Sequence, residues 1–456
     1  MTPGSSAASA SSTLEGANIE ARVDIAIVGA GPAGMAAACS AATAGSNVVV
    51  FDDNPSAGGQ IWRGLGGESS EASESARRWL RRFRRSGASL QTGSRVIGCG
   101  PMPKSLLVES KEGVRVVPYR RLILATGARE LFLPFPGWTL PNVFGVGGIQ
   151  ALAKSGLSVE TKRVVVAGTG PLLLAVAAYL RTHGAQVSVI AEQASFGALA
   201  WFSRHLLRFP SKISEAVQLQ SKLFGIPYCC GTWVESASGD RRVESVTIRQ
   251  GQHRWIEPCD YLAIGYGFHS NLELPALFGC EIRRTAVIVD GLQRSTVEDV
   301  YCAGEPTGIG GVDLALAEGE IAGYAAAGLL DKAVAMQPAR ERWRRFAVAL
   351  EGAFAPRPEL RSLPQADTIV CRCEDVSWGR IQAKTSWRSA KLHVRCGMGP
   401  CQGRICGPAL EFLKGWGSES VRPPIFPTTV GNLTELEMRS STDRGAGPRQ
   451  AAHDPE

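Results

Sequence analysis

A strand, a glycine-rich turn, a helix and a second strand near the N-terminus constrain the fold of this chain more than any other feature. An apolar run leads into GAGPAG, and a helix of small residues then leads to a second run, VVVF. In such a βαβ unit the first glycine makes the turn, the second admits a pyrophosphate and the third lets the helix contact the strand. The helix N-terminus favours the anion. The predicted nucleotide-binding residues are Gly29, Gly31, Pro32, Ala33 and Gly34, with Asp52 as the ribose acceptor and Asp53 as the second candidate for that role.

The same pattern recurs between Lys162 and Glu192, where a strand leads into a Gly-Thr-Gly turn, a helix and another strand. Two departures separate this copy from the first. Leu173 replaces the third glycine, and Glu192 comes one residue late. The pattern predicts a second dinucleotide fold around Gly168 and Gly170, whereas NAD(H) binding and a vestigial or differently occupied site both stay open. NADP is disfavoured because no pair of arginines stands where a 2′-phosphate would need one.

Five cysteines lie close together near the C-terminus, at Cys371, Cys373, Cys396, Cys401 and Cys406. No secretion signal or membrane-length apolar run is evident in the chain, so we expect a cytoplasmic protein whose clustered thiols serve metal or redox chemistry. Thiolates can hold zinc or a [2Fe–2S] cluster. The glycine-rich stretch GMGPCQGRICG and the absence of two CxxC knuckles favour the cluster, with zinc and simple packing as alternatives.

Further motifs accompany the glycine turns, namely GGQIW at 58–62, LILATGAR at 122–129 and DVYCAGEPTGIGG at 299–311. Together with the two dinucleotide folds, they resemble the flavoproteins that include glutathione and thioredoxin reductases. The resemblance implies FAD in the first fold, with further contacts from Gly59, Gln60, Thr126, Gly127, Gly304 and Glu305. Glu305 stands where those proteins have an aspartate for the ribityl chain. The redox CxxC of a disulfide reductase is absent from the sequence.

The cysteine stretch has a resemblance of its own. CRCEDV followed by GMGPCQGRIC is similar to the bacterioferritin-associated-ferredoxin-like (BFD-like) [2Fe–2S] domain. The similarity is to the version fused to the larger flavoprotein subunit of opine oxidases, hydroxyproline dehydrogenases and hydrogen cyanide synthases. By this resemblance the cluster ligands are Cys371, Cys373, Cys401 and Cys406. Cys396 stands where a small residue is expected, and we interpret it as a near-cluster thiol that could also compete as a ligand.

These patterns predict an α/β architecture of two dinucleotide-binding domains, like that of glutathione and thioredoxin reductases, with a small C-terminal helical domain. Disordered tails are expected at 1–21 and 437–456. The expected domains are a discontinuous FAD domain at 22–138 and 285–335, an NAD-type domain at 139–284 and a BFD-like [2Fe–2S] domain at 365–436.

The resemblance implies an electron-transfer flavoprotein subunit of a hetero-oligomeric, dye-linked amine dehydrogenase. A glycine-oxidase-like partner subunit with its own flavin would oxidise a CH–NH or CH–NH2 group of an opine, hydroxyproline, proline or glycine-type substrate. Electrons would pass through FAD and [2Fe–2S] to a respiratory acceptor. A small third subunit, FMN at a subunit interface and peripheral contact with the inner membrane are further options. No catalytic residue stands out in this chain, whose six histidines are scattered.

Two other functions stay open from the sequence. One is a self-contained NAD(P)H:acceptor reductase that uses the second fold, and the other is a zinc-stabilised scaffold with degenerate nucleotide folds. The net charge of +7 comes largely from arginine clusters at 77–85 and 340–346, which are typical of solvated helix faces or of a docking face for an acidic protein. No nucleic-acid recognition motif accompanies them, so no nucleic-acid partner is expected.

Overall fold

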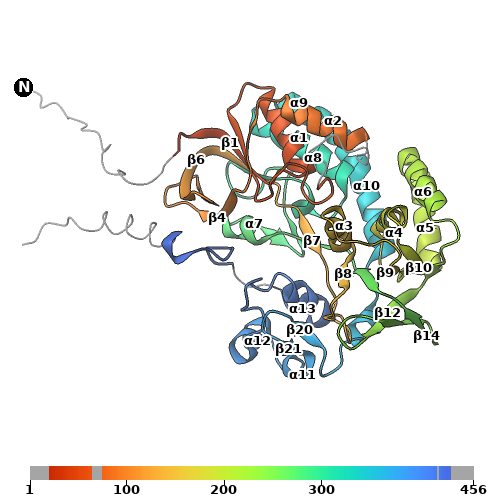
Figure 1. Cartoon of the computed structure of the whole chain (residues 1–456). Helices are drawn as coiled ribbons and strands as arrows, with labels where there is room; N and C mark the ends of the chain where they lie inside the picture. The colour runs from red at the N-terminus through yellow and green to blue at the C-terminus, as the bar shows by residue number, and fades with distance from the viewer. Residues whose placement is uncertain (1–19, 64–73, 418–420, 433–456) are drawn as a thin grey trace, which may run out of the picture.

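The computed structural model describes residues 20–63, 74–417 and 421–432. It has the predicted α/β architecture of two dinucleotide-binding domains, and a small C-terminal module lies against both of them (Figure 1). The expected disordered tails lie outside the described residues, apart from positions 20 and 21. Within the described ranges, no helix is long and apolar enough to cross a membrane.

The first domain is built on a sheet whose parallel strands run in the order β3-β2-β1-β6, with β19 also beside β6. These strands are β1 (Val23–Val28), β2 (Val48–Phe51), β3 (Ser89–Gln91), β6 (Gly113–Leu124) and β19 (Val300–Cys302). Two antiparallel strands, β4 (Arg95–Cys99) and β5 (Ser105–Ser110), continue the sheet from β6. Because β19 comes from far along the chain, two separated stretches of sequence build this domain.

Helices α1 (Pro32–Ala42) and α8 (Val312–Ala326) pack against each other beside this sheet. Both are rich in alanine and glycine and are largely buried. A Cβ at Gly319 would overlap the backbone oxygen of Ala33, so glycine is needed for the two helices to approach this closely. Helix α2 (Glu74–Arg84) covers α1, burying its apolar side and exposing most of its arginines.

The second domain has a five-stranded parallel sheet in the order β11-β10-β9-β15-β8. Its strands are β8 (Val143–Gly145), β9 (Arg163–Gly168), β10 (Gln186–Glu192), β11 (Tyr228–Cys230) and β15 (Tyr261–Gly265). Successive side chains of a strand point to opposite faces. One face is covered by α3 (Val146–Lys154) and α4 (Leu172–Thr182), and the other by the antiparallel strands β12 (Thr232–Ser238), β13 (Ser245–Gln250) and β14 (His253–Pro258).

Leu173 is fully buried between α4 and the sheet of the second domain. The second βαβ unit therefore forms with a buried leucine in place of the third glycine.

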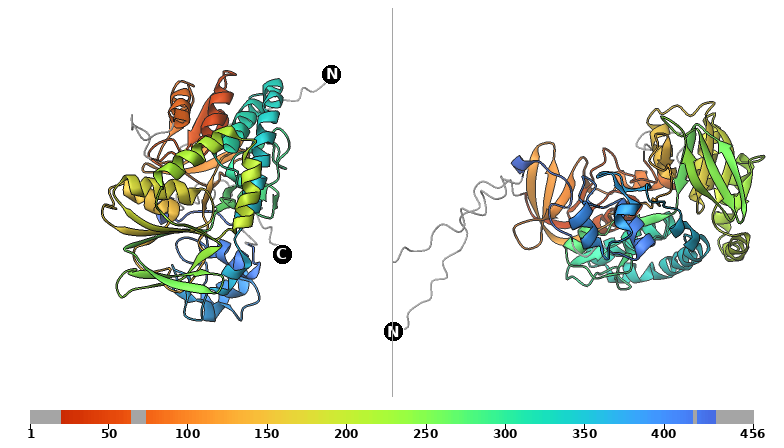
Figure 2. Two further views of the ribbon diagram at one scale, coloured as in Figure 1. Left: turned by 90° about the vertical axis from the view of Figure 1, so that its right-hand side faces the viewer. Right: turned by 90° about the horizontal axis from the view of Figure 1, so that it is seen from below.

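Helix α10 (Gln337–Phe354) crosses from the first domain to the second, beside α5 (Phe196–Leu206) and α6 (Pro210–Lys222) (Figures 1 and 2). On the first domain it is held by the buried ion pair between Arg340 and Glu318, at 3.3 Å. On the second it packs through aromatic rings, among which are Phe202–Phe354 at 5.4 Å and Phe209–Trp343 at 5.4 Å.

The C-terminal module has a small core of its own around Trp387, and this core includes the side chains of Cys371, Cys396 and Cys406. Its elements are β20 (Ile369–Cys371), β21 (Val376–Ser377), α11 (Trp378–Ile381), α12 (Trp387–Val394) and α13 (Cys406–Lys414). Residues 421–432 leave this module and pack on the first domain, where the Ile425 N–H donates to the Ile97 carbonyl oxygen at 2.9 Å. The expected boundary at 436 lies outside the described residues.

Candidate flavin and cysteine-cluster sites

The residues predicted to contact FAD gather at one edge of the first sheet. The parallel strands β1, β2, β6 and β19 all end there, and each leads within two residues to a predicted contact. In the same order, these contacts are Gly29, Asp52, Thr126 and Gly304. Ligands of open α/β sheets bind outside the carboxyl ends of the strands. The sheet therefore brings four distant segments of the chain to one binding edge.

The first glycine turn lies tightly against this edge. Gly29 has a φ of +103°, and a Cβ there would overlap the carbonyl oxygen of Ala125. A Cβ at Gly34 would overlap the carbonyl oxygen of Gly29, so the third glycine is required by the helix–strand contact. Gly31 faces Gly59, whose own Cβ would come within 2.9 Å of the Gly31 Cα. The two backbones form a cradle without side chains, which suits the close approach of a pyrophosphate.

The structure separates the two candidate ribose acceptors. Asp52 is buried; its Oδ2 accepts from the Ala30 N–H at 2.6 Å and its Oδ1 from the Asn54 N–H at 2.8 Å. Asp53 points outward and forms an ion pair with Arg95 at 3.5 Å. Asp52 is therefore the acid at the glycine turn, and Asp53 belongs to the surface.

Glu305 lies at the N-terminal end of α8, where its carboxylate accepts from the N–H groups of Gly310 and Gly311, both at 3.1 Å. Burial raises the pKa of Glu305 to about 7, although these two N–H groups act to lower it. The neighbouring Gly304 lies so close to α1 that a Cβ there would come within 2.8 Å of the Ala33 Cβ.

The other predicted contacts also lie in or near these turns. Pro32 and Ala33 begin α1, Gly127 follows Thr126 with a φ of +70°, and Gln60 is exposed.

The second glycine turn is organised around Glu192, which has no exposed surface. Its Oε2 accepts from the Gly170 N–H at 2.8 Å and its Oε1 from the Ala194 N–H at 2.8 Å. Burial raises the pKa of this carboxyl, and the same two N–H groups oppose the rise. Asp52 is bound in a similar way: it accepts from the Ala30 N–H in the first turn and from the Asn54 N–H, two residues after Asp52 itself. Glu192, although one residue late, thus occupies the equivalent position.

The chain itself covers this second turn. The segment that leaves α10 lies across it: Thr169 Oγ1 donates to the Phe354 carbonyl oxygen at 3.0 Å, and Gln193 Nε2 donates to that of Ala355 at 3.1 Å. The Arg357 N–H donates back to Gln193 Oε1 at 3.0 Å. A Cβ at Gly170 would lie 4.0 Å from the Phe354 ring. We call residues 354–357 the cover segment; it lies across the side of the turn that carries Thr169 and Gly170.

The five clustered cysteines form an inner group and an outer pair. The sulfur atoms of Cys371, Cys396 and Cys406 lie within 4.8 Å of one another, and all three residues are buried. Cys373 is exposed and Cys401 is half-buried. The sequence predicted Cys396 to be a near-cluster thiol, and the structure places its sulfur within 4.8 Å of those of Cys371 and Cys406.

The electrostatics favour a thiolate at Cys371 alone, because interaction with the Cys371 sulfur and burial raise the pKa values of Cys396 and Cys406. Hydrogen bonds from the thiols of Cys396 and Cys406 lower the pKa of Cys371 to about 2, and backbone N–H groups act in the same direction. One of these is the Gly397 N–H, which lies 3.5 Å from the Cys371 sulfur. The loop that contains Gly399 passes so close to Cys373 that a Cβ at Gly399 would overlap the Cys373 Cβ. Three buried sulfurs beside a glycine-rich backbone are compatible with an iron–sulfur centre.

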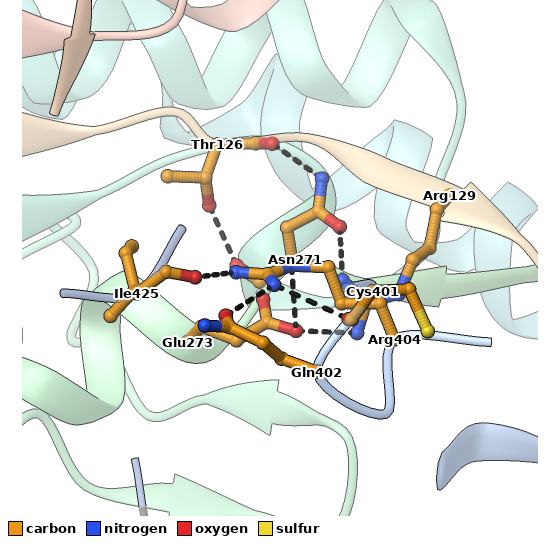
Figure 3. A network of polar contacts seen from close by, with 8 residues as sticks. All are labelled: Thr126, Arg129, Asn271, Glu273, Cys401, Gln402, Arg404 and Ile425. Carbon is orange, nitrogen blue, oxygen red and sulfur yellow. Dashed lines mark hydrogen bonds and ion pairs between the residues drawn. The ribbon is translucent and has the colours of Figure 1, made fainter. Parts of the chain in front are cut away.

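A polar network joins the cysteine loop to the turn after β6 (Figure 3). Thr126 Oγ1 donates to the Asn271 carbonyl oxygen at 2.7 Å, and Asn271 Nδ2 donates to the Thr126 carbonyl oxygen at 2.8 Å. Asn271 Oδ1 accepts from Arg129 Nη1 at 2.7 Å. Arg129 Nη2 in turn forms an ion pair with Glu273 Oε1 at 2.7 Å.

Arg404 completes this network from the cysteine side. Its Nε lies 3.8 Å from Glu273 Oε1, and its Nη1 donates to the Cys401 carbonyl oxygen at 3.4 Å and to Gln402 Oε1 at 2.9 Å. Its Nη2 donates to the Ile425 carbonyl oxygen. Arg404 therefore connects the loop of Cys401 to the first domain and to the segment that returns there (Figure 3).

Sequence reasoning did not identify Asn271 or Glu273 as site residues. They follow β16 (Phe268–Ser270), which pairs with β7 (Ala128–Glu130) and so brings them beside Arg129. No spacing pattern in the sequence marks such residues, because their roles depend on contacts with strands and loops elsewhere in the chain.

Comparisons with known proteins agree with this geometry. The family model described as pyridine nucleotide-disulphide oxidoreductase matches residues 23–319. Hydrogen cyanide synthase subunit HcnB of Pseudomonas aeruginosa is 33% identical, over 83% of this chain and 90% of that protein. An opine oxidase subunit of Rhizobium meliloti is 31% identical, over 91% of this chain and 98% of that protein. Among solved structures, L-proline dehydrogenase from P. horikoshii shares the fold with a TM-score of 0.64 and 20% identity, over 91% of this chain and 80% of that one.

Proposed function

This chain belongs to the pyridine nucleotide-disulphide oxidoreductase family of FAD-dependent oxidoreductases, and on that premise we propose that it is the electron-transferring subunit of a hetero-oligomeric amine dehydrogenase. In this proposal the first glycine turn and the edge of the first sheet hold FAD. The proposed ligands of a [2Fe–2S] cluster are Cys371, Cys373, Cys401 and Cys406. A glycine-oxidase-like partner subunit holds the substrate and a flavin of its own.

The proposed reaction is the oxidation of a CH–NH or CH–NH2 group to an imine, which releases two electrons and two protons. Two relatives with more than 30% identity are subunits of an opine oxidase and of a hydrogen cyanide synthase, so opines, glycine and proline-type amines form the substrate class to test. Bound FAD accepts two electrons and can release them singly, and a [2Fe–2S] cluster takes them one at a time on the way to a respiratory acceptor.

The observation that carries this proposal is the cover segment over the second glycine turn. A reductase that takes hydride from NAD(P)H needs that turn to receive the pyrophosphate, and Thr169 and Gln193 instead bind backbone carbonyls of the same chain. Electrons are therefore expected to come from another subunit. The network from Thr126 to Arg404 gives further support, because it holds the cysteine loop against the first domain.

Anaerobic reduction of the purified complex tests the proposal against its main alternative, a self-contained NAD(P)H:acceptor reductase. The complex of this chain with its partner subunit should reduce an artificial dye with at least one member of a panel of opines, proline derivatives and glycine. NADH or NADPH should leave the flavin absorbance unchanged. Rapid bleaching by either nucleotide would refute the proposed division of labour, and zinc in place of iron would refute the assignment of the cysteines.

A further inference from the structure

The outward sides of helices α5 and α10 have no role in the proposed function. The two helices pack their facing sides against each other around Phe202 and Phe346, whose ring centroids lie 5.9 Å apart. Their outward sides carry large apolar residues: Leu207 is 71% exposed, Val348 62% and Trp201 42%. Single exposed apolar residues are normal at a protein surface, but residues that gather in one place mark an interaction site.

Packing brings these outward sides together along one seam. At one end, a Cβ at Gly352 of α10 would lie 3.6 Å from the Trp201 ring of α5. At the other end, Arg342 Nη2 donates to the Arg208 carbonyl oxygen at 3.5 Å. The two helices therefore run antiparallel, and the exposed residues between these contacts are neighbours. We call this surface the α5–α10 face; its residues are Trp201, Arg204, Leu207, Arg208, Arg345 and Val348.

The α5–α10 face is basic. Arg204 and Arg208 are exposed, and α5 contains no acidic residue. On α10, Arg345 forms an ion pair with Glu341 at 3.5 Å but keeps 73% of its side chain exposed, and Arg344 beside it is exposed as well. Positive charge therefore surrounds the apolar residues of the face.

The kind of cation indicates the kind of partner. Neither α5 nor α10 contains lysine, so the charge of these helices comes from arginine. Aromatic residues and arginine are enriched in protein–protein interfaces and lysine is depleted, whereas an anionic lipid surface attracts lysine and arginine alike. The composition of the face therefore favours a protein.

A second copy of this chain does not suit the α5–α10 face. A symmetric dimer contact places one patch against itself, so arginines would meet arginines, and like charges in contact are destabilising. A surface with an apolar centre and acidic residues around it is complementary in both respects. Resting on the proposed function, we propose that this face docks such an acidic surface of the partner subunit that holds the substrate.

Hydrogen exchange followed by mass spectrometry tests the location of the contact. The full-length chain is compared alone and in its purified complex with the partner subunit, on peptides that cover residues 196–208 and 341–352. Exchange there should slow at least about tenfold in the complex, because a docked partner suppresses the opening of both helices. Peptides from α2, the other arginine-rich helix, should exchange equally in both samples.

Charge reversal tests the chemistry of the contact by surface plasmon resonance on immobilised partner subunit. Arg204→Glu/Arg208→Glu should associate at least about tenfold more slowly at low salt, and high salt should shrink the difference. The matched control Arg77→Glu/Arg81→Glu reverses exposed charges at the same spacing on α2 and should bind like the wild type. Trp201→Ala should raise the Kd at least about thirtyfold, as truncation of an aromatic anchor does.

The outcomes separate this inference from the proposed function. A chain that forms no complex with the partner subunit would refute the proposed function and this inference with it. A complex in which α5 and α10 exchange as in the free chain would refute the inference alone, as would equal weakening by the two charge reversals. Protection of the same peptides only in a homodimer, or only on phosphatidylglycerol vesicles, would assign the face to a second copy or to a membrane and would overturn it.

Discussion

Replacing Glu273 with alanine should release the cysteine loop from the first domain. The Glu273 carboxylate lies between two guanidinium groups, 2.7 Å from Arg129 and 3.8 Å from Arg404. The three side chains are 23%, 19% and 15% exposed respectively. Removing one partner of a buried ion pair costs roughly 3–5 kcal/mol, and the residual exposure here places the expected cost at the lower end, about 3 kcal/mol.

The expected change in dynamics follows from this free energy. Each 1.4 kcal/mol is a factor of ten, so a loss of about 3 kcal/mol raises the population of the undocked loop by about a hundredfold. Hydrogen exchange followed by mass spectrometry on peptides that cover residues 399–407 and 421–426 measures this population directly. Glu281→Ala is the matched control, because it removes the same charge from an exposed pair with Arg283, and such pairs contribute little.

The same contact predicts a dependence on pH. Burial acts to raise the pKa of Glu273, but Arg129 and Arg404 outweigh it and hold that pKa below its ordinary value of 4.5. The stabilisation is therefore fully present above pH 4.5 and is lost as the pH falls through the folded-state pKa. Exchange rates in Glu273→Ala within fivefold of those in wild type at pH 7, or equal to those in Glu281→Ala, would refute the role assigned to this carboxylate.

Further predictions concern the other sites. Gly34→Ala places a methyl group on the carbonyl oxygen of the first turn and should cost about 3 kcal/mol and abolish flavin absorbance, whereas Gly197→Ala in α5 should leave both unchanged. Without FAD, Glu305 has a folded-state pKa of about 7 against an ordinary 4.5, so stability should fall as the pH rises between these values; thermal unfolding at pH 5 and pH 8 should show a smaller difference in Glu305→Gln. Gln193→Ala removes hydrogen bonds to the cover segment and should cost about 2 kcal/mol, seen as faster exchange at residues 354–357. Cys401→Ser should abolish the iron–sulfur absorption bands, and persistence of these bands would contradict its assignment as a ligand.

The parts of the molecule that could be predicted from sequence are those in which the chain folds onto itself locally. In the first dinucleotide turn, the N–H of Ala30 and the carboxylate of Asp52 are only 22 positions apart, and one βαβ unit brings them together. Glycines at fixed spacing are needed because any Cβ at Gly29 or Gly34 would overlap a backbone oxygen. Such requirements appear in the sequence because a short segment satisfies them by itself.

It was harder to predict which of Asp52 and Asp53 faces the glycine turn and where the side chain of Cys396 lies, although all three residues had been identified as candidates. Neighbouring residues point in different directions, and a single turn of backbone decides which one faces inward. Asp53 faces Arg95 at the surface, and Cys396 lies in the core directly after Arg395, which adopts a left-handed conformation. Composition and spacing carry little information about such a reversal.

The sequence by itself determined two dinucleotide folds and a thiol-rich segment, since each depends on residues that are close along the chain. Tertiary structure alone decided how these parts act together. The cover segment binds Thr169 from 185 positions away, and Arg129 reaches Asn271 across 142 positions. Contacts at such separations arise only when whole domains pack, because helix α10 and strand β16 must first be placed by the cores around them. The closed second turn and the docked cysteine loop, from which the proposed direction of electron flow follows, are therefore properties of the assembled fold.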